Sequence, residues 1–320
     1  MRIIESVPNI SEGRDQEKIK RIMASLEAHK DINVIGCEPD KDYNRTVISL
    51  IGAPEMMIEA LVDLTRAAAR EIDLNHHSGQ HPRMGAVDVI PLIPISGVTM
   101  KEAVDYARIL GEKIAMDLTI PVFLYAEAAT EEKRVNLPNI RKGEFEGMKE
   151  KIKDPEWKPD YGHPEIHPTF GAVAIGARAP LIAYNIDLDT HDEKLAATLA
   201  RMIRKSNGGF QYIQAGPASL IDRGHVQVTM NILDYKKNPI YRIFELIKLE
   251  AKRYHVAVPS AEIVGLVPKE ALCQSLAYYF GVESIGEKPE DLSLEALVDY
   301  AVRFLDLRDF SIEKIIESYL

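Results

Sequence analysis

The spacing of apolar residues changes several times along the first half of the chain, between the strand period of about two and the helical period of about 3.6. Each change marks a boundary between predicted elements. Two helix starts carry clear signals: Pro54, because a first turn does not need its missing N–H, and Thr99 with Glu102, which form a capping-box pattern. The elements predicted for this half are, in order, a strand at 2–6, a helix at 19–26, strands at 33–37 and 45–51, a helix from 54, a strand at 87–90, a helix from 99 and a strand at 121–125.

The second half repeats this order of elements. In its clearest segment, 225–232, apolar residues alternate with Gln227, Thr229 and Asn231, as in a strand with one buried face. The predicted elements are a strand at 181–188, a helix at 190–205 with a capping box at Thr190 and Glu193, strands at 212–215 and 225–232, a helix from 239 and a strand at 263–267. The remaining residues, 269–320, are predicted to be helical with a break near 281–289.

The order strand, helix, strand, strand, helix, strand is that of a ferredoxin-like domain. We therefore predict an α+β protein of two ferredoxin-like subdomains, 1–178 and 179–320, with helices on one face of each sheet and a helical C-terminal tail. A long stretch rich in proline, glycine and charge, 133–169, precedes the boundary and is predicted to be irregular. A connection of that length in a compact chain is usually functional or mobile.

Composition and charge narrow the class of protein. Of 320 residues, 46% are hydrophobic, which is ordinary globular usage, and no apolar run approaches the length of a membrane span. The 39 Lys and Arg against 49 Asp and Glu give a formal net charge of −10, which disfavours a broad surface for nucleic acid or anionic lipid. The N-terminal segment does not resemble a signal peptide, and the two cysteines, Cys37 and Cys273, suit a reducing compartment. We expect a cytoplasmic protein.

The densest group of chemically active residues is the segment 76–85, HHSGQHPRMG, between a predicted helix and a predicted strand. His81 is the favoured catalytic group, because Pro82 biases it to extended geometry and the flanking glycines permit sharp turns that hold its imidazole. A neutral imidazole is suited to take a proton from an amine and return it to a leaving nitrogen. Ordinary surface histidines or a zinc site built from His76, His77 and His81 are the alternatives, although Gly79 and Pro82 interrupt ligand spacing.

Other segments carry polar residues that fit either a ligand site or plain structure. The turn 8–13 with Asn9 is a ligand contact or a helix N-cap, and 38–45, with three carboxylates near Arg45, is a site or a hairpin tip. Asn185, Asp187 and Asn231 lie on the polar side of their predicted strands, which is also what a wet sheet face looks like. The segment 160–171 suits a binding strap or a linker. No glycine-rich phosphate motif is complete, so no nucleotide cofactor is expected.

Taken together, these segments resemble the glutamate formiminotransferase family, the transferase part of formiminotransferase-cyclodeaminase. The resemblance runs almost end to end, and many ordered matches make it specific where a single match is weak. The segments that carry it are VPNISEG (7–13), NRTV (44–47), HPRMGAVDV (81–89), LYAEAA (124–129), LPNIRKGEFEG (137–147), GAR (176–178), QVTMN (227–231) and VGLVP (264–268).

The resemblance implies a homodimer with a cleft between subdomains that binds tetrahydrofolate as co-substrate, without metal or nucleotide. The implied reaction moves the formimino group from N-formimino-L-glutamate to N5 of tetrahydrofolate, with His81 as the catalytic residue. Carboxylate anchors are expected among Arg45, Arg83, Arg141 and Arg178. The full set of expected substrate or folate contacts is Gly162, His163, Pro164, Glu165, Ile166, His167, Pro168, Thr169, Phe170, Gly171, Asn9, Arg45, Arg83, Asn185 and Asn231.

Some positions depart from the family pattern, and three alternatives stay open. Tyr43 stands where a histidine is common in relatives and Glu38 where an aspartate is, and the chain lacks a cyclodeaminase portion, so a separate protein is expected to process the product. One alternative keeps folate but uses N-formylglutamate as donor. The others are a non-catalytic folate-binding module and a metal-dependent hydrolase using His76, His77 and His81.

Overall fold

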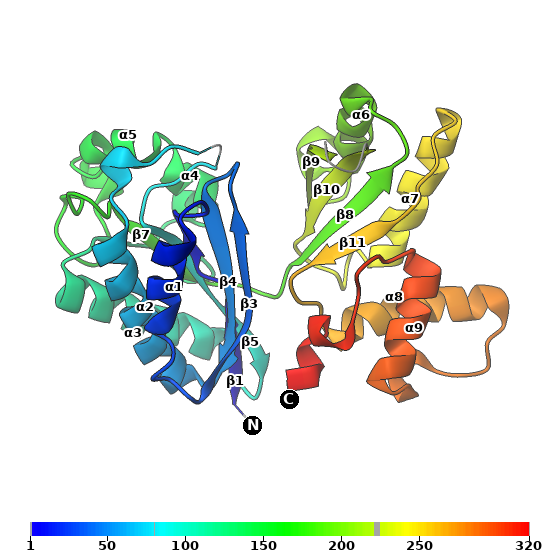
Figure 1. Ribbon diagram of the computed structural model, residues 1–320, viewed down its shortest axis with the longest axis horizontal. Coiled ribbons are helices and arrows are strands. Elements are labelled where there is room, and N and C mark those ends of the chain that lie inside the picture. Colours follow the sequence, from blue (N-terminus) through cyan, green and yellow to red (C-terminus); the bar gives the residue numbers. More distant parts are fainter. Residues whose placement is uncertain (1, 80, 221–224, 320) are drawn as a thin grey trace. The chain divides into compact units, whose positions relative to one another are not determined.

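The computed structural model describes residues 2–79, 81–220 and 225–319 and divides the chain into two compact units, Met1–Ala179 and Pro180–Leu320 (Figure 1). Each unit contains one β-sheet with helices packed on it, so the fold is mixed α/β with two sheets. Apolar cores form separately in the two units.

The first unit is organised around a seven-stranded sheet with strand order β1-β4-β2-β5-β7-β6, in which β3 lies beside β4. β1 and β2 each pair with both β4 and β5, so they act as one interrupted strand. Pro8, which has no N–H to donate, stands at the interruption. The segment 8–13, expected to be a turn, therefore contributes a short strand. The strands are β1 (Ile3–Ser6), β2 (Asn9–Ile10), β3 (Ile32–Asp40), β4 (Arg45–Gly52), β5 (Val87–Ser96), β6 (Val122–Ala126) and β7 (Val173–Ala177).

Three long helices pack on one face of this sheet: α1 (Gln16–Ala24), α2 (Pro54–Glu71) and α3 (Met100–Leu118). Their apolar residues meet alternate residues of the strands, such as Leu124 of β6 and Ile175 of β7. Pro54 begins α2 and the Thr99–Glu102 capping box begins α3, both as predicted. The helix expected at 19–26 begins earlier, because the Asp15 side chain accepts from the amides of Glu17 and Lys18.

The opposite face of the sheet is covered in part by two short helices, α4 (Leu137–Arg141) and α5 (Glu144–Lys151). Phe123, Tyr125 and Ala174 point to this side and form a third core with Ile140 and Met148. Helices were expected on only one face of this sheet. In this unit they cover both faces, because β6 is apolar on both sides. The stretch 133–169, expected to be irregular, contains these helices and the 3-10 turns η2 (Glu132–Arg134) and η3 (Pro155–Trp157).

β7 was not predicted, because its sequence VAIGA is short and contains a glycine. It runs parallel to both β5 and β6 and lies between them. A Cβ at Gly176 would stand 2.5 Å from the ring of Tyr125, so this position needs a glycine for close packing. The glycine that weakened the strand signal is therefore a packing requirement of the strand itself.

The second unit has the element order βαββαβ and a four-stranded antiparallel sheet with strand order β11-β8-β10-β9. Its helices cover one face, where Tyr184, Val228 and Phe244 join the core, and the other face is polar. The capping box expected at Thr190 is replaced by Asp192, whose carboxylate accepts from the amides at the start of α6. The elements are β8 (Ile182–Leu188), α6 (Glu193–Ile203), η4 (Lys205–Asn207), β9 (Ile213–Leu220), β10 (His225–Ile232), α7 (Ile240–Arg253) and β11 (Ala261–Val264).

The C-terminal segment is helical and packs into the core of the second unit, where Leu276 and Phe304 are buried. Its helices are α8 (Lys269–Glu283) and α9 (Leu294–Leu305), with the 3-10 turns η6 (Pro289–Asp291), η7 (Ile312–Lys314) and η8 (Ile316–Tyr319). The predicted break near 281–289 separates α8 from α9. No helix in the described part of the chain has the length and apolar character to cross a membrane.

Candidate functional site

The histidine-rich segment 76–85 lies in the first unit, between the 3-10 turn η1 (Leu74–His76) and β5. The turn between β3 and β4 holds one side of it. Asn44, in left-handed conformation with φ 50°, donates from Nδ2 to the carbonyl oxygen of Ser78 and accepts from the Gly13 amide. A Cβ on Gly79 would stand 2.3 Å from the Tyr43 carbonyl oxygen, so only glycine permits this close approach. The loop is thus fixed on the β3–β4 turn.

His81 projects from this loop onto the start of β4. Its Nε2 lies 3.0 Å from Nη1 of Arg45, and the ring of Tyr43 meets it edge to face at 6.3 Å. A guanidinium only donates, so Nε2 is the accepting, unprotonated nitrogen. Burial and the nearby charges of Arg45 and Arg141 lower the pKa of His81 to about 3. In this arrangement the imidazole is neutral and its Nε2 lone pair is occupied by Arg45.

Arg45 and Arg141 form the cationic side of the site. Nη1 of Arg45 also donates to Oδ1 of Asn9, at 3.1 Å, while Nη2 of Arg141 lies 2.5 Å from Oδ2 of the buried Asp88. Burial, and then the charge of Arg141, lower the pKa of Arg45. Among the described residues, the buried Nε atoms of both arginines have no hydrogen-bond partner. The pair therefore has unused donors beside His81.

The turn that carries Arg141 is itself anchored. Nζ of Lys151, on α5, donates to the carbonyl oxygens of Asn139 and Ile140 at the end of α4. Asp88 is held from the other side, because its Oδ1 accepts from the Met84 amide at 2.8 Å. Arg141 is thus positioned by backbone and side-chain contacts that do not involve its own Nε.

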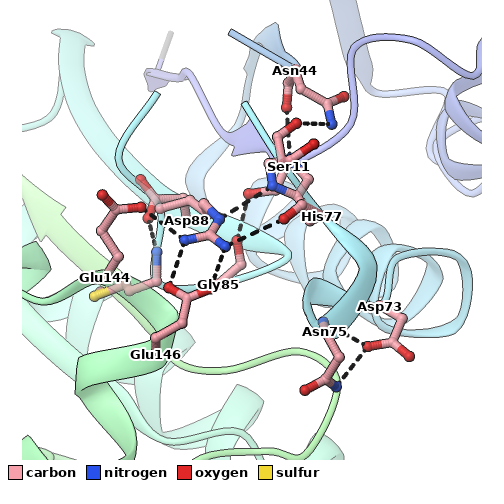
Figure 2. A network of polar contacts seen from close by, with 12 residues as sticks. Ser11, Asn44, Asp73, Asn75, His77, Gly85, Asp88, Glu144 and Glu146 are labelled. Atoms are coloured by element: carbon pink, nitrogen blue, oxygen red, sulfur yellow. Dashed lines mark hydrogen bonds and ion pairs between the residues drawn. The ribbon is translucent and has the colours of Figure 1, made fainter. Parts of the chain in front are cut away.

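Arg83 has a different environment, because its guanidinium is bonded to Glu144, Glu146 and His77, three residues that Figure 2 labels. Nε donates to Nδ1 of His77, Nη1 donates to both glutamates, and Nη2 donates to Glu146 and, at 3.5 Å, to the His77 carbonyl oxygen. These contacts use all the N–H groups of a guanidinium. Arg83 was expected to contact substrate; here it ties the histidine loop to α5.

The three imidazoles of the loop have different partners. His76 is exposed and lies 3.8 Å from Asp73, whereas Nε2 of His77 is 3.0 Å from the Asn44 carbonyl oxygen. Because Arg83 donates to the other nitrogen of His77, that ring is also held in one neutral tautomer, and burial lowers its pKa. Within the described ranges no group of three or more His, Cys, Asp or Glu side chains is placed to hold a metal ion.

The segment 162–171, expected to bind folate, divides into an exposed part and a buried part. His163, Pro164 and Glu165 are exposed. By contrast, Phe170 is fully buried, and a Cβ on Gly171, where φ is 86°, would stand 2.1 Å from the Met84 carbonyl oxygen. The turn is closed by Nδ1 of His167, which accepts from the Phe170 amide. The buried part braces the histidine loop, as backbone hydrogen bonds from Ala86 to Phe170 and from Ala172 to Met84 also show. The remaining members of the segment are Gly162, Ile166, Pro168 and Thr169.

Asn185 and Asn231 belong to the second unit and lie on the polar face of its sheet. Asn185 is paired in register with Thr229 and with Glu262, and both asparagines are partly exposed. The neighbouring Asp187 is different, because it is buried and bonded to Gln227, Ser260 and Arg308. Asp187 therefore holds the C-terminal segment on the sheet.

Arg178, the fourth expected anchor, follows β7 in the first unit. It lies near the buried Glu5, whose pKa burial raises to about 7 against the opposing charge of Arg178. Sequence reasoning did not single out Asp88, although it is the one ionisable residue in the apolar segment VDVIPLI and so carried a signal. Asn44 and His77 lacked such a signal, because their roles depend on the contact between two distant loops.

Residues 3–178 match the family described as formiminotransferase domain, N-terminal subdomain, and residues 183–320 match the formiminotransferase domain family. A glutamate formimidoyltransferase of Streptococcus pyogenes serotype M1 is 43% identical over 282 residues, covering 88% of this chain and 94% of the relative. One from Thermoplasma acidophilum is 41% identical, covering 90% of this chain and 95% of the relative.

A longer relative, a formimidoyltransferase-cyclodeaminase of Dictyostelium discoideum, is 36% identical over 304 residues. That alignment covers 93% of this chain and 56% of the relative, so this chain corresponds to about half of the bifunctional protein. The family matches span nearly the whole chain, and the similarity extends over nearly the full length of the bacterial and archaeal relatives. On these grounds the chain belongs to the formiminotransferase family.

Proposed function

We propose that the protein is a folate-dependent enzyme that transfers the formimino group from N-formimino-L-glutamate to N5 of tetrahydrofolate, releasing L-glutamate. The observation that carries this proposal is the near-full-length similarity to two relatives named glutamate formimidoyltransferase, at 43% and 41% identity. Those names favour the formimino donor over N-formylglutamate and favour an enzyme over a binding module.

The chemistry needs one group that takes and returns a proton. N5 attacks the amidine carbon of the donor and becomes cationic, so a base must remove its proton. The bond between that carbon and the glutamate nitrogen then breaks, and the same proton neutralises the departing nitrogen. His81 is the proposed shuttle, because it is neutral, fixed on a braced loop and next to the guanidinium of Arg45.

Substrate contacts are proposed for residues beside His81, for the exposed part of 162–171 and for the polar face of the second sheet. Arg45 and Asn9 lie beside His81 and are proposed to contact the donor. The exposed residues His163, Pro164 and Glu165 are proposed as the part of 162–171 that contacts tetrahydrofolate. Asn185 and Asn231, on the polar face of the second sheet, remain proposed substrate contacts.

The test is formation of 5-formiminotetrahydrofolate by the purified protein from tetrahydrofolate and N-formiminoglutamate, followed by its absorbance and by product chromatography. N-formylglutamate in a parallel reaction tests the other donor. Turnover with the formimino donor is expected. Turnover with the formyl donor alone would contradict the proposed substrate, and no turnover with either would contradict the proposed activity.

We also propose a cytoplasmic homodimer whose product is taken by a cyclodeaminase. The support is the family resemblance and the existence of longer relatives named formimidoyltransferase-cyclodeaminase, such as the Dictyostelium protein. Sedimentation equilibrium of the purified chain tests the oligomeric state. A mass near 35.9 kDa at all concentrations would contradict the dimer.

A further inference from the structure

The two arginines beside His81 have more positive charge and more donors than their contacts use. Among the described residues, Asp88 is the carboxylate in direct contact with this pair, and it bonds to Arg141. Asp40 acts on Arg45 only through space, while its Oδ1 accepts from the amides of Asp42 and Tyr43 in the β3–β4 turn. Arg45 thus has no carboxylate in contact among the described residues, and it uses Nη1 on the neutral acceptors Asn9 and His81.

An unpaired buried charge is expensive, and so is a buried N–H without an acceptor. Here both occur together, because the Nε groups of Arg45 and Arg141 are buried and lack partners within the described residues. Arg45 and Arg141 are also close enough for their charges to repel, which lowers the pKa of Arg45. A single carboxylate bound beside the two guanidiniums would neutralise the excess charge and supply acceptors for their N–H groups.

The contact between Arg45 and His81 also conflicts with proton transfer by His81. A general base needs a free lone pair, and Nε2 is engaged at 3.0 Å by a group that cannot accept a proton from it. A base with a pKa of about 3 is also far from the operating pH, where proton transfer is efficient. His81 is therefore blocked until Arg45 acquires another partner.

We propose that the α-carboxylate of the donor binds between Arg45 and Arg141 and, by drawing Arg45 from Nε2 of His81, frees that nitrogen for proton transfer. This inference rests on the proposed function, since it assigns the donor subsite and its regulation. The α-carboxylate is the fitting group because in an α-amino acid derivative a single carbon separates it from the reacting nitrogen. Anchoring it on Arg45 brings that nitrogen next to His81.

The charges around His81 agree with this direction. Arg45, Arg141 and His77 all disfavour its protonated form, and the ring facing it is that of Tyr43. A carboxylate on the arginines offsets two of these influences, so the pKa of His81 rises when the donor binds. The base becomes competent only with its substrate present, which limits unproductive proton exchange in the free enzyme.

The direct test is the NMR titration of the His81 ring in protein with labelled histidine, with the signal assigned by its loss in His81→Gln. L-Glutamate, the product, is compared with 4-aminobutyrate, which is identical except that it lacks the α-carboxylate. L-Glutamate is expected to shift the His81 signal and raise its pKa, and 4-aminobutyrate is expected to do neither. Equal responses to the two ligands, or no response to L-glutamate at saturation, would overturn the proposal.

Variants localise the effect. Arg45→Gln and Arg141→Gln are expected to abolish the response of His81 to L-glutamate and to raise the KM for the formimino donor about tenfold to a hundredfold, with the KM for tetrahydrofolate unchanged. Arg45→Lys, which keeps the charge without the two-pronged geometry, should recover part of the loss. Arg108→Gln is the matched control, because Arg108 is an exposed residue of α3 paired only with Asp105 among the described residues. An unchanged donor KM in both glutamine variants would overturn the proposal.

The outcomes separate this inference from the proposed function. Turnover with the formimino donor, without any glutamate-dependent change at His81, leaves the function and removes the carboxylate subsite. A glutamate-dependent change at His81 without turnover keeps the subsite and removes the function. The wild-type comparison of two ligands needs no variant to fold, so it decides the question even where a substitution lowers stability.

Discussion

Two arginine clusters flank the histidine loop, and they differ in how completely their N–H groups are paired. Every donor of Arg83 has an acceptor, supplied by Glu144, Glu146 and His77 (Figure 2). Arg45 and Arg141 keep buried donors without acceptors in the described part of the chain. A saturated arginine fixes the loop, while an unsaturated pair is suited to bind an anion. The same residue type is thus a scaffold on one side of His81 and a proposed ligand group on the other.

The surroundings reinforce this contrast. The scaffold side includes the turn 167–171, which packs Phe170 in the core and brings Gly171 against Met84. On the ligand side, Asn9 and His81 share one nitrogen of Arg45. Both kinds of arginine are buried or partly buried, so the count of satisfied donors, and not burial, is what distinguishes the scaffold arginine from the proposed ligand arginines.

The largest effect is expected at the residue between the clusters. His81→Gln preserves much of the ring's volume and polarity but cannot shuttle a proton, so kcat should fall about 10²–10⁴-fold. Steady-state kinetics with both substrates, together with binding of tetrahydrofolate, measure this. Loss of folate binding in parallel with kcat would point to a structural defect, and kcat within about threefold of wild type would remove His81 from its role.

The next largest effect is expected from a substitution in the buried core of the scaffold side. Phe170→Ala should lower the free energy of unfolding by about 3–5 kcal/mol, because it leaves a cavity under the histidine loop. Its matched control is the exposed His163→Ala, which should change stability by less than about 0.5 kcal/mol while weakening tetrahydrofolate binding. Chemical denaturation and folate titration test the pair. Equal stability of the two variants would contradict the division of this segment.

The contrast between the two arginine clusters is tested by substituting one arginine from each cluster separately. Arg83→Met should lower the free energy of unfolding by about 1–3 kcal/mol, because it releases the loop from α5, with little change in the donor KM. Arg45→Gln should do the reverse, raising the donor KM with stability nearly unchanged. Thermal melts and kinetics on both variants decide this. A donor KM that rises equally in both would erase the distinction between the two clusters.

A further effect is expected in the pH dependence of stability. Folding lowers the pKa of His81 from its ordinary 6.5 to about 3, so below pH 6.5 the unfolded chain binds a proton that the folded protein does not. The free energy of unfolding should therefore fall as pH decreases from 6.5 towards 3, by up to about 1.4 kcal/mol per pH unit. His81→Gln should lack this share of the acid sensitivity. Identical slopes for variant and wild type in urea melts at several pH values would contradict the assigned pKa.

Much of the fold could be predicted, because the signals involved are local. The period-two pattern of β10, the proline that starts α2 and the capping box of α3 each act within a few residues. The unpredicted elements, β2, β7, α4 and α5, are short, and they form where long-range packing compensates for weak local preference. Gly176 shows why: it weakens the strand signal, yet the ring of Tyr125 requires it.

In the candidate site, too, some features could be predicted from the sequence and others could not. His81 stood out because its local sequence, with Pro82 after it and glycines around it, restricts the backbone. The contrast between Arg83 and Arg45 could not be predicted from the sequence, since both are arginines in motifs shared with the family. It depends on which carboxylates the folded chain brings near each guanidinium, and Glu144 and Glu146 lie about sixty residues from Arg83.

Residue types, helix caps, strand periods and the family pattern follow from the order of amino acids, because they depend on interactions within a few positions or on similarity that is written in that order. The tertiary structure alone decided which donors are satisfied, which histidine tautomer is held and that Nε2 of His81 is covered by Arg45. The physical reason is that hydrogen bonding and desolvation depend on distances of a few ångströms between segments that are remote along the chain.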